Sequence, residues 1–189
     1  NVEVASGGSI VHSTAGTMVA RNGVRLHVTG DMNVAAGGAV NVNGKGYAAK
    51  AGPGHPVVEN YTARGGAHGG AAYDLAGVTT YGSVREPALW GSGGNAGAGG
   101  GEIGLTVDGT LTVNGTVSAN GAGSKESGAG GSVWIVTPTL AGSGTISANG
   151  GDGEKAVFNA GGGGRIAVTL TDPEAKIADF GGAIEARGG

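Results

Sequence analysis

The sequence lacks several features that define common classes of protein. It contains no cysteine, which excludes a disulfide framework and a thiolate metal site. Its 5 prolines occur without a Gly-X-Y period, so the chain is not collagen-like. No apolar run approaches the roughly 18 residues of a membrane-spanning helix, and no basic start precedes an apolar core as in a signal peptide. We therefore expect no membrane span.

Charge is also scarce along the chain. Only 13% of the residues are charged, and the formal net charge is −3. Lysine and arginine form no cluster, so nucleic acid is not expected as a partner. The hydrophobic pattern predicts no amphipathic helix, apart from one turn within residues 171–180.

Glycine is the residue that the chain has in excess. It accounts for 45 of the 189 residues, whereas an average composition of about 7% would give about 13. In ordinary helices and strands each glycine costs roughly 0.5–1 kcal/mol relative to alanine. With 39% apolar residues, the chain is not a flexible linker either. We therefore expect a fold whose geometry requires small residues.

A three-part repeat organises most of the chain. Residues 105–123 read LTVDGTLTVNGTVSANGAG, in which three short alternating pieces are each followed by a turn. The unit recurs at residues 26–46, 133–153 and 165–188, the last with arginine in place of the closing asparagine, and residues 1–24 look like a degenerate first unit. One such unit cannot bury its own apolar face, so the repeat indicates stacked units.

Stacking predicts that equivalent strands pair in parallel about 4.8 Å apart. The inward residues of the first strands are expected to form one apolar stripe, made of Val28, Val107, Ile135 and Val168. Small inward residues fit a narrow interior, namely Ala119, Ala148 and Ala186. The Asn-Gly pairs are expected to be corners, because both residues tolerate positive φ and asparagine can bond the neighbouring unit. These corner residues are Asn43, Gly44, Asn120, Gly121, Asn149 and Gly150.

The third and fourth repeats resemble a known group of proteins. Residues 130–153 read GGSVWIVTPTLAGSGTISANGGDG, and residues 160–168 read AGGGGRIAV. This signature is similar to the glycine-rich parallel β-helix segments of secreted and cell-surface proteins, which share the pectin-lyase-like solenoid. The resemblance covers about residues 26–42 and 103–189. It implies a right-handed parallel β-helix in an extracellular or cell-surface setting, but not an activity, since such proteins include adhesins, fibres and polysaccharide-degrading enzymes.

Residues 47–101 interrupt the repeat within what we expect to be a single domain, 1–189, with coils at about 1–46 and 102–189. This glycine-rich insert holds all four tyrosines, so we expect it to be ordered and packed on the repeat body. Its aromatic and charged residues suit a ligand such as a polysaccharide, although they could equally serve only to anchor the insert. The candidate ligand-binding residues are Arg64, His68, Tyr73, Tyr81, Arg85 and Trp90.

Evidence for catalysis or a cofactor in the sequence is weak. His68, Tyr81 and Arg85 are the right types for a polysaccharide lyase or hydrolase, but paired carboxylates are scarce, so no catalytic residue is assigned. No cofactor is assigned; Ca²⁺ is the candidate, because residues 150–154 partly match Gly/Asp-rich calcium repeats, with Asp108 and Asp152 as candidate ligands. Asn60 and Asn114 begin glycosylation sequons.

The leading hypothesis is a non-enzymatic extracellular module, structural or adhesive, built as a β-solenoid. The alternative is a β-helix that binds or cleaves polysaccharide through residues 47–101. The strand-like start at Asn1 and the repeat-like end at Arg187 further predict that the chain continues a longer β-helix or that copies stack end to end into filaments.

Overall fold

The computed structural model describes residues 1–13, 23–56, 64–71, 79–154 and 159–189. These residues form an all-β structure with three parallel sheets, as expected for the fold class. One 3-10 turn, η1 (Ile177–Asp179), falls where one turn of helix was predicted. No helix in the described ranges is long and apolar enough to cross a membrane.

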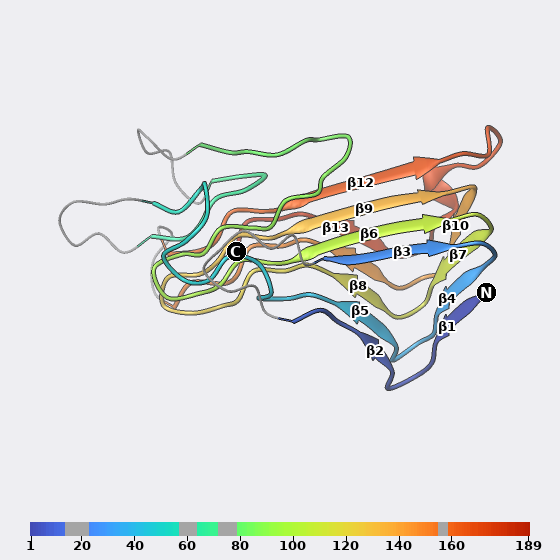
Figure 1. Ribbon diagram of the computed structural model, residues 1–189, viewed down its shortest axis with the longest axis horizontal. Helices are drawn as coiled ribbons and strands as arrows, with labels where there is room; N and C mark the ends of the chain where they lie inside the picture. Colours follow the sequence, from blue (N-terminus) through green and yellow to red (C-terminus); the bar gives the residue numbers. More distant parts are fainter. Residues whose placement is uncertain (14–22, 57–63, 72–78, 155–158) are drawn as a thin grey trace.

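The chain visits the three sheets in a fixed order (Figure 1). Sheet A contains β1 (Val2–Val4), β4 (Met32–Val34), β7 (Thr110–Val113) and β10 (Thr139–Ala141). Sheet B contains β2 (Ser9–Ile10), β5 (Ala39–Asn41), β8 (Thr116–Ser118), β11 (Thr145–Ser147) and β13 (Ala183–Glu185). Sheet C contains β3 (Val24–Val28), β6 (Glu102–Val107), β9 (Ser132–Thr137) and β12 (Arg165–Leu170). Each passage through the sheets therefore adds one parallel strand to each of them, except that η1 stands in the place of a fifth strand in sheet A.

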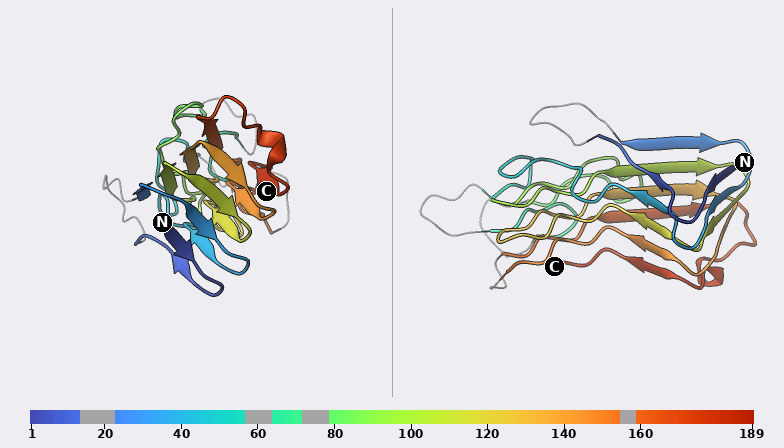
Figure 2. Two further views of the ribbon diagram at one scale, coloured as in Figure 1. Left: turned by 90° about the vertical axis from the view of Figure 1, so that its right-hand side faces the viewer. Right: turned by 90° about the horizontal axis from the view of Figure 1, so that it is seen from below.

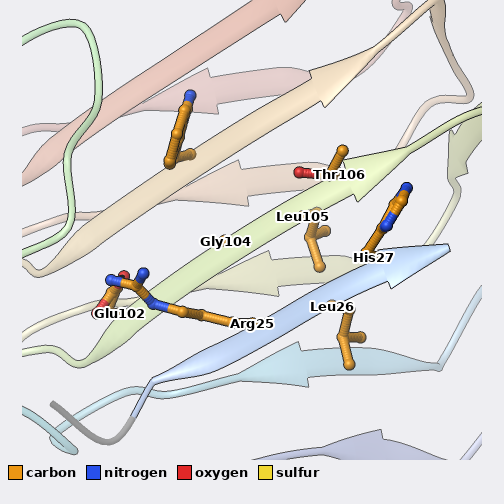
Figure 3. Close-up of a pocket in the computed structure, with 8 residues that line it drawn as sticks. Arg25, Leu26, His27, Glu102, Gly104, Leu105 and Thr106 are labelled. Carbon is orange, nitrogen blue, oxygen red and sulfur yellow. Dashed lines mark ion pairs between the residues drawn. The ribbon is translucent and has the colours of Figure 1, made fainter.

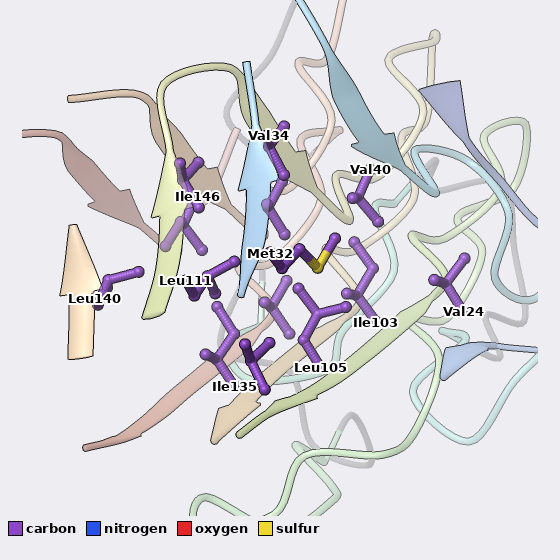
Figure 4. Close-up of a cluster of buried hydrophobic side chains, with 14 of the residues drawn as sticks. Val24, Met32, Val34, Val40, Ile103, Leu105, Leu111, Ile135, Leu140 and Ile146 are labelled. Atoms are coloured by element: carbon purple, nitrogen blue, oxygen red, sulfur yellow. The ribbon is translucent and has the colours of Figure 1, made fainter. Parts of the chain in front are cut away.

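One apolar core lies between the three sheets. Alternate residues of the strands β1 to β12 point into it, as the period of two requires, whereas Ile184 of the last strand, β13, is exposed. Figure 4 shows side chains converging from different sheets, including Met32 and Leu111 of sheet A, Val40 and Ile146 of sheet B, and Ile103 of sheet C. Ala119 and Ala148 are fully buried as predicted, whereas Ala186, after the last strand, is exposed.

The predicted inward stripe is wrong by one row. Ile135 pairs with Leu105 rather than with Val107, and Val168 pairs with Ile135. Val107 pairs instead with Val28, in the adjacent row. Both rows point inward because they are two residues apart, so the shift exchanges neighbours in the core without turning any side chain outward.

The Asn-Gly corners form a ladder between successive passages of the chain. The Oδ1 of Asn43 accepts a hydrogen bond from the backbone N of Asn120 at 2.7 Å, and the Oδ1 of Asn120 accepts one from Asn149 at 2.7 Å. The Oδ1 of Asn149 accepts the last bond, from the backbone N of Arg187 at 2.9 Å. The arginine at the fourth corner thus still donates through its backbone but adds no further acceptor to the ladder.

Positive φ explains only one of the three corner glycines. Gly44 has φ +63°, but Gly121 and Gly150 are not in the left-handed region. At those two positions an added Cβ would lie closer than 3.0 Å to a backbone carbonyl oxygen, that of Gly128 or Gly161. Close approach of backbones, rather than turn conformation, therefore requires glycine there.

The glycine-rich region comprises the described parts of residues 46–101 together with the joints 121–131 and 149–164. It contains no strand within the described ranges, apart from one isolated bridge between Ser124 and Gly153. It lies at one end of the sheets, where extended segments from different parts of the chain run side by side (Figures 1 and 2). These segments bond to one another through the backbone: Gly162 donates to Gly66 and accepts from Gly130, while Gly163 accepts from Gly69.

Candidate functional site

The outer face of sheet C carries two adjoining hollows. The strands β3, β6, β9 and β12 place their outward residues in two rows across the sheet. One row consists of Arg25, Gly104, Trp134 and Ala167, and the next consists of His27, Thr106, Val136 and Thr169. Residues from widely separated parts of the sequence are thus brought together by the register of the sheet.

Trp134 is the centre of this face. It is half-buried on β9, and its cross-strand neighbours are the two smallest residue types, Gly104 on β6 and Ala167 on β12. A large ring between two small residues leaves space on both of its sides. The first hollow, on the β6 side, has a volume of about 280 Å³, and the second, on the β12 side, about 700 Å³.

Polar and apolar residues both line the first hollow (Figure 3). Arg25 extends from β3 along the sheet and forms an ion pair with Glu102 at the start of β6. The Glu102 side chain is 2% exposed and that of Arg25 is 51% exposed, so the carboxylate is covered while the guanidinium still reaches solvent. His27 lies farther along β3, where its Nε2 is 2.9 Å from Oδ1 of Asp108.

The second hollow lies between sheet C and a segment of the insert. Val84, Arg85 and Glu86 form one wall, and the outer faces of β9 and β12 form the floor. Val84 is 69% exposed, so an apolar side chain faces solvent beside the second hollow. The Oγ of Ser83 accepts hydrogen bonds from the backbone N of Arg85 at 3.2 Å and of Glu86 at 3.0 Å, which shape this wall into a tight turn.

A cluster of side chains holds the base of the wall against the rest of the molecule. The Tyr81 hydroxyl donates to the carbonyl of Trp90 at 2.6 Å and lies 2.8 Å from Oγ of Ser92. The Nε of Arg165, at the start of β12, donates to the carbonyl of Tyr81 at 2.9 Å. The Tyr81 ring packs on His68, with ring centroids 4.7 Å apart. The wall of the second hollow is therefore anchored through Tyr81, both to β12 and to residues 68, 90 and 92 of the insert.

His68 and Tyr81 are held in their neutral forms. Burial lowers the pKa of His68 to about 4, although a hydrogen bond from its Nδ1 to the carbonyl of Gly130 at 2.8 Å opposes this effect. Burial also raises the pKa of Tyr81 well above its usual range. Both groups are uncharged at neutral pH and point into packed protein, so neither is placed to exchange protons with a bound polymer.

The structure divides the residues that the sequence suggested for ligand binding. Arg85 lies in the wall of the second hollow. His68, Tyr81 and Trp90 lie together beneath this wall, where the ring of Trp90 also contacts Tyr47 edge-on at 5.4 Å. Arg64 is half-buried in the glycine-rich region and does not line either hollow. Tyr73 and the sequon residue Asn60 lie outside the described residues.

Sequence reasoning missed the residue at the centre of the site. Trp134 lies between Val133 and Ile135, both fully buried in the core. Strict alternation along a strand therefore directs the tryptophan to the outer face, and this signal was available in the repeat. The two flanking small residues could not be found in the same way, because they become neighbours of Trp134 only through the register of β6 and β12.

The candidate calcium ligands do not form a complete metal site. Within the described ranges, no group of three or more His, Asp or Glu side chains could hold a metal ion. Asp108 pairs with His27, and Asp152 is exposed, with its backbone carbonyl accepting a hydrogen bond from the Ser127 hydroxyl at 2.6 Å. The other sequon residue, Asn114, is exposed after β7.

Comparison of the chain with protein-family models, with curated proteins and with solved structures found no match. Function is therefore inferred from the geometry of the site itself.

Proposed function

We propose that this protein is a non-enzymatic adhesive module, built as a right-handed parallel β-helix, that binds a polysaccharide across the outer face of sheet C outside the cell. One observation carries the proposal: Trp134 stands half-buried between Gly104 and Ala167, with an open hollow on either side. An indole beside open space offers an apolar surface on which the C–H face of a sugar ring can pack, while nearby polar groups meet the hydroxyls.

Two features of the fold support the β-helix in this proposal. The order of the sheets repeats with each passage of the chain, and the asparagine ladder links the corner of each passage to the next. The handedness and the extracellular setting come from the resemblance in residues 130–168. A stacked fold of this kind presents a long, flat outer face, which suits an extended polymer better than a small molecule.

The polar groups around Trp134 support binding rather than catalysis. Arg25 and Arg85 reach the two hollows from opposite sides, each next to a carboxylate, Glu102 or Glu86. The buried residues His68 and Tyr81 hold the wall of the second hollow in position and do not contact the proposed ligand. The insert therefore contributes to the proposed surface mainly through residues 84–86.

Binding to a panel of soluble oligosaccharides tests this proposal. The panel contains neutral oligomers of glucose, mannose, galactose and xylose and acidic oligomers of galacturonate, and binding is measured by calorimetry. We expect at least one to bind, and Trp134→Ala to weaken that binding at least tenfold. Thr116→Val, on the outer face of sheet B, is the matched control and keeps full affinity. Absence of binding across the panel, or full affinity in Trp134→Ala, contradicts the proposal.

A second candidate function is cleavage of the bound chain, and one observation favours it. His27 lines the first hollow and is paired with Asp108 at 2.9 Å, so a carboxylate orients an imidazole beside the proposed ligand. Release of new chain ends from the panel, lost in His27→Ala and kept in His55→Ala, would establish this function. If the oligosaccharides are unchanged after prolonged incubation, cleavage is contradicted and only the binding function remains.

A further inference from the structure

Gly104 is an unusual glycine for its position. It lies within the six-residue strand β6, where a glycine weakens the strand because it loses more backbone freedom and has no side chain to pack. Its neighbours in the row are Arg25 and Trp134, both with large side chains. A side chain at this position would fill the space between them.

Neither backbone conformation nor crowding requires glycine at position 104. Gly104 is not in the left-handed region. An added Cβ would meet only Cγ of Arg25, at the ordinary van der Waals distance of 3.6 Å. By contrast, a Cβ added at Gly100 or Gly131 would lie closer than 3.0 Å to backbone atoms. The packing that explains those two glycines therefore does not explain Gly104.

The space left by Gly104 has a definite size and polarity. Adjacent strands lie about 4.8 Å apart, so the backbones that carry Arg25 and Trp134 are about 10 Å apart across it. Arg25 presents N–H donors, but the buried carboxylate of Glu102 compensates its charge. Thr106, in the adjacent row, adds a hydroxyl to the same hollow. The hollow thus offers one aromatic side, hydrogen-bonding groups and little net charge.

We infer that Gly104 determines ligand specificity, because the space over it holds an uncharged sugar ring packed against Trp134 and hydrogen-bonded by Arg25. This inference rests on the proposed function and names the ligand class at the same site. A sugar carboxylate would gain little from a guanidinium that Glu102 already neutralises, and it would lose hydration on entering the hollow. Hydroxyl groups accept hydrogen bonds from the guanidinium without this cost.

Filling the hollow tests the inference. Gly104→Val places a branched side chain in a strand position that favours it, so its melting temperature is expected to equal or exceed that of the wild type. Its affinity for the neutral oligosaccharide that binds best is expected to fall at least tenfold. The wild type is expected to bind galacturonate oligomers at least tenfold more weakly than that neutral oligosaccharide.

The controls separate failure of this inference from failure of the proposed function. Full affinity in Gly104→Val, with binding lost in Trp134→Ala, overturns the role of Gly104 and leaves the binding function intact. Equal or tighter binding of galacturonate oligomers overturns the preference for an uncharged ring. If Trp134→Ala also binds normally, or the wild type binds nothing, both proposals fail. If Gly104→Val lowers the melting temperature, Gly104→Ala is used in its place, because its methyl group has room. Weaker binding by Gly104→Ala then supports the role of Gly104, and full affinity overturns it.

Discussion

The three sheets and the glycine-rich region obey opposite packing rules within one chain. Between the sheets, large apolar side chains such as Leu105 and Ile135 fill the interior, and backbones are kept apart by them. In the glycine-rich region, backbones touch directly, and an added Cβ at Gly65, Gly99 or Gly128 would lie closer than 3.0 Å to a carbonyl oxygen. The sheets are held together by packed apolar side chains, whereas the glycine-rich region is held together by backbones that approach closely because side chains are absent.

This difference teaches how one chain can stabilise extended segments in two ways. In the sheets, burial of apolar surface accompanies the ladder hydrogen bonds. In the glycine-rich region, backbone hydrogen bonds to several neighbours replace side-chain burial, as shown by residues 161–164, which bond to four other segments. The excess of glycine in the composition is therefore a packing requirement and not a sign of flexibility.

The strongest test of the comparison removes side-chain volume from the core between the sheets and adds a methyl group in the glycine-rich region. We expect Leu105→Ala to lower the free energy of unfolding by about 2–5 kcal/mol, because it leaves a cavity in the core. We expect Gly128→Ala to lower it by about 3 kcal/mol, because the new methyl group meets the backbone at Ala98. Urea denaturation followed by circular dichroism measures both. Normal stability in Gly128→Ala would show that the close backbone packing is not required.

The second test concerns pH and the buried imidazole of the glycine-rich region. Between the usual histidine pKa of 6.5 and the pKa of about 4 for His68, the unfolded chain binds a proton that the folded chain does not. Stability is therefore expected to fall as the pH is lowered through this range, by at most about 3 kcal/mol. Denaturation midpoints at several pH values measure the slope. His68→Gln should flatten it.

The third test concerns the asparagine ladder, which links successive passages of the chain at their corners. Asn120→Ala removes the acceptor of the backbone N of Asn149, so we expect a loss of about 1–2 kcal/mol of stability. Asn33→Ala, at the middle of β4 and away from the ladder, is the control, because no side-chain hydrogen bond of Asn33 is found within the described residues. Equal effects of the two changes in thermal denaturation would contradict a stabilising role for the ladder.

The smallest effect is expected at the glycine that belongs to the sheets. Gly104→Ala should leave stability unchanged or raise it by about 0.5–1 kcal/mol, since the methyl group has room and the unfolded chain loses freedom. Gly131→Ala, which adds the same methyl group in the glycine-rich region, should destabilise the protein instead. Stability changes of opposite sign, measured by calorimetry, would distinguish the glycine that lines the hollow from the glycine that backbone packing requires.

The repeat made the sheets predictable from sequence, but not their pairing. Alternation in LTV, LTV and VSA located β6, β7 and β8, the last to within one residue, and the same pattern located the strands of the neighbouring repeats. The error over Ile135 and Val107 arose because two inward residues occur two positions apart in each strand, so alternation alone fits either register. Register is fixed by contacts between strands, which the sequence of one strand does not contain.

The glycine-rich region and the site were less accessible to sequence reasoning. The aromatic residues of the insert suggested binding, yet His68 and Trp90 are buried and support the wall. Their burial depends on backbone contacts between distant segments, such as the bond from His68 to Gly130, and glycine carries no side-chain pattern that predicts them. Trp134 was predictable as an outward residue, but the hollows beside it depend on residues from two other strands.

The two outward rows of sheet C also have a consequence for variation of the protein. Their eight positions lie outside the core, which is formed by the inward neighbours on the same strands. Substitutions at most of these positions can accumulate at little cost in stability, except at Arg25, whose loss would remove an ion pair from the buried Glu102 carboxylate. The glycine-rich region, by contrast, contains glycines that tolerate almost no change. The surface is therefore suited to evolve or be redesigned for new ligands one position at a time, on a frame that stays constant.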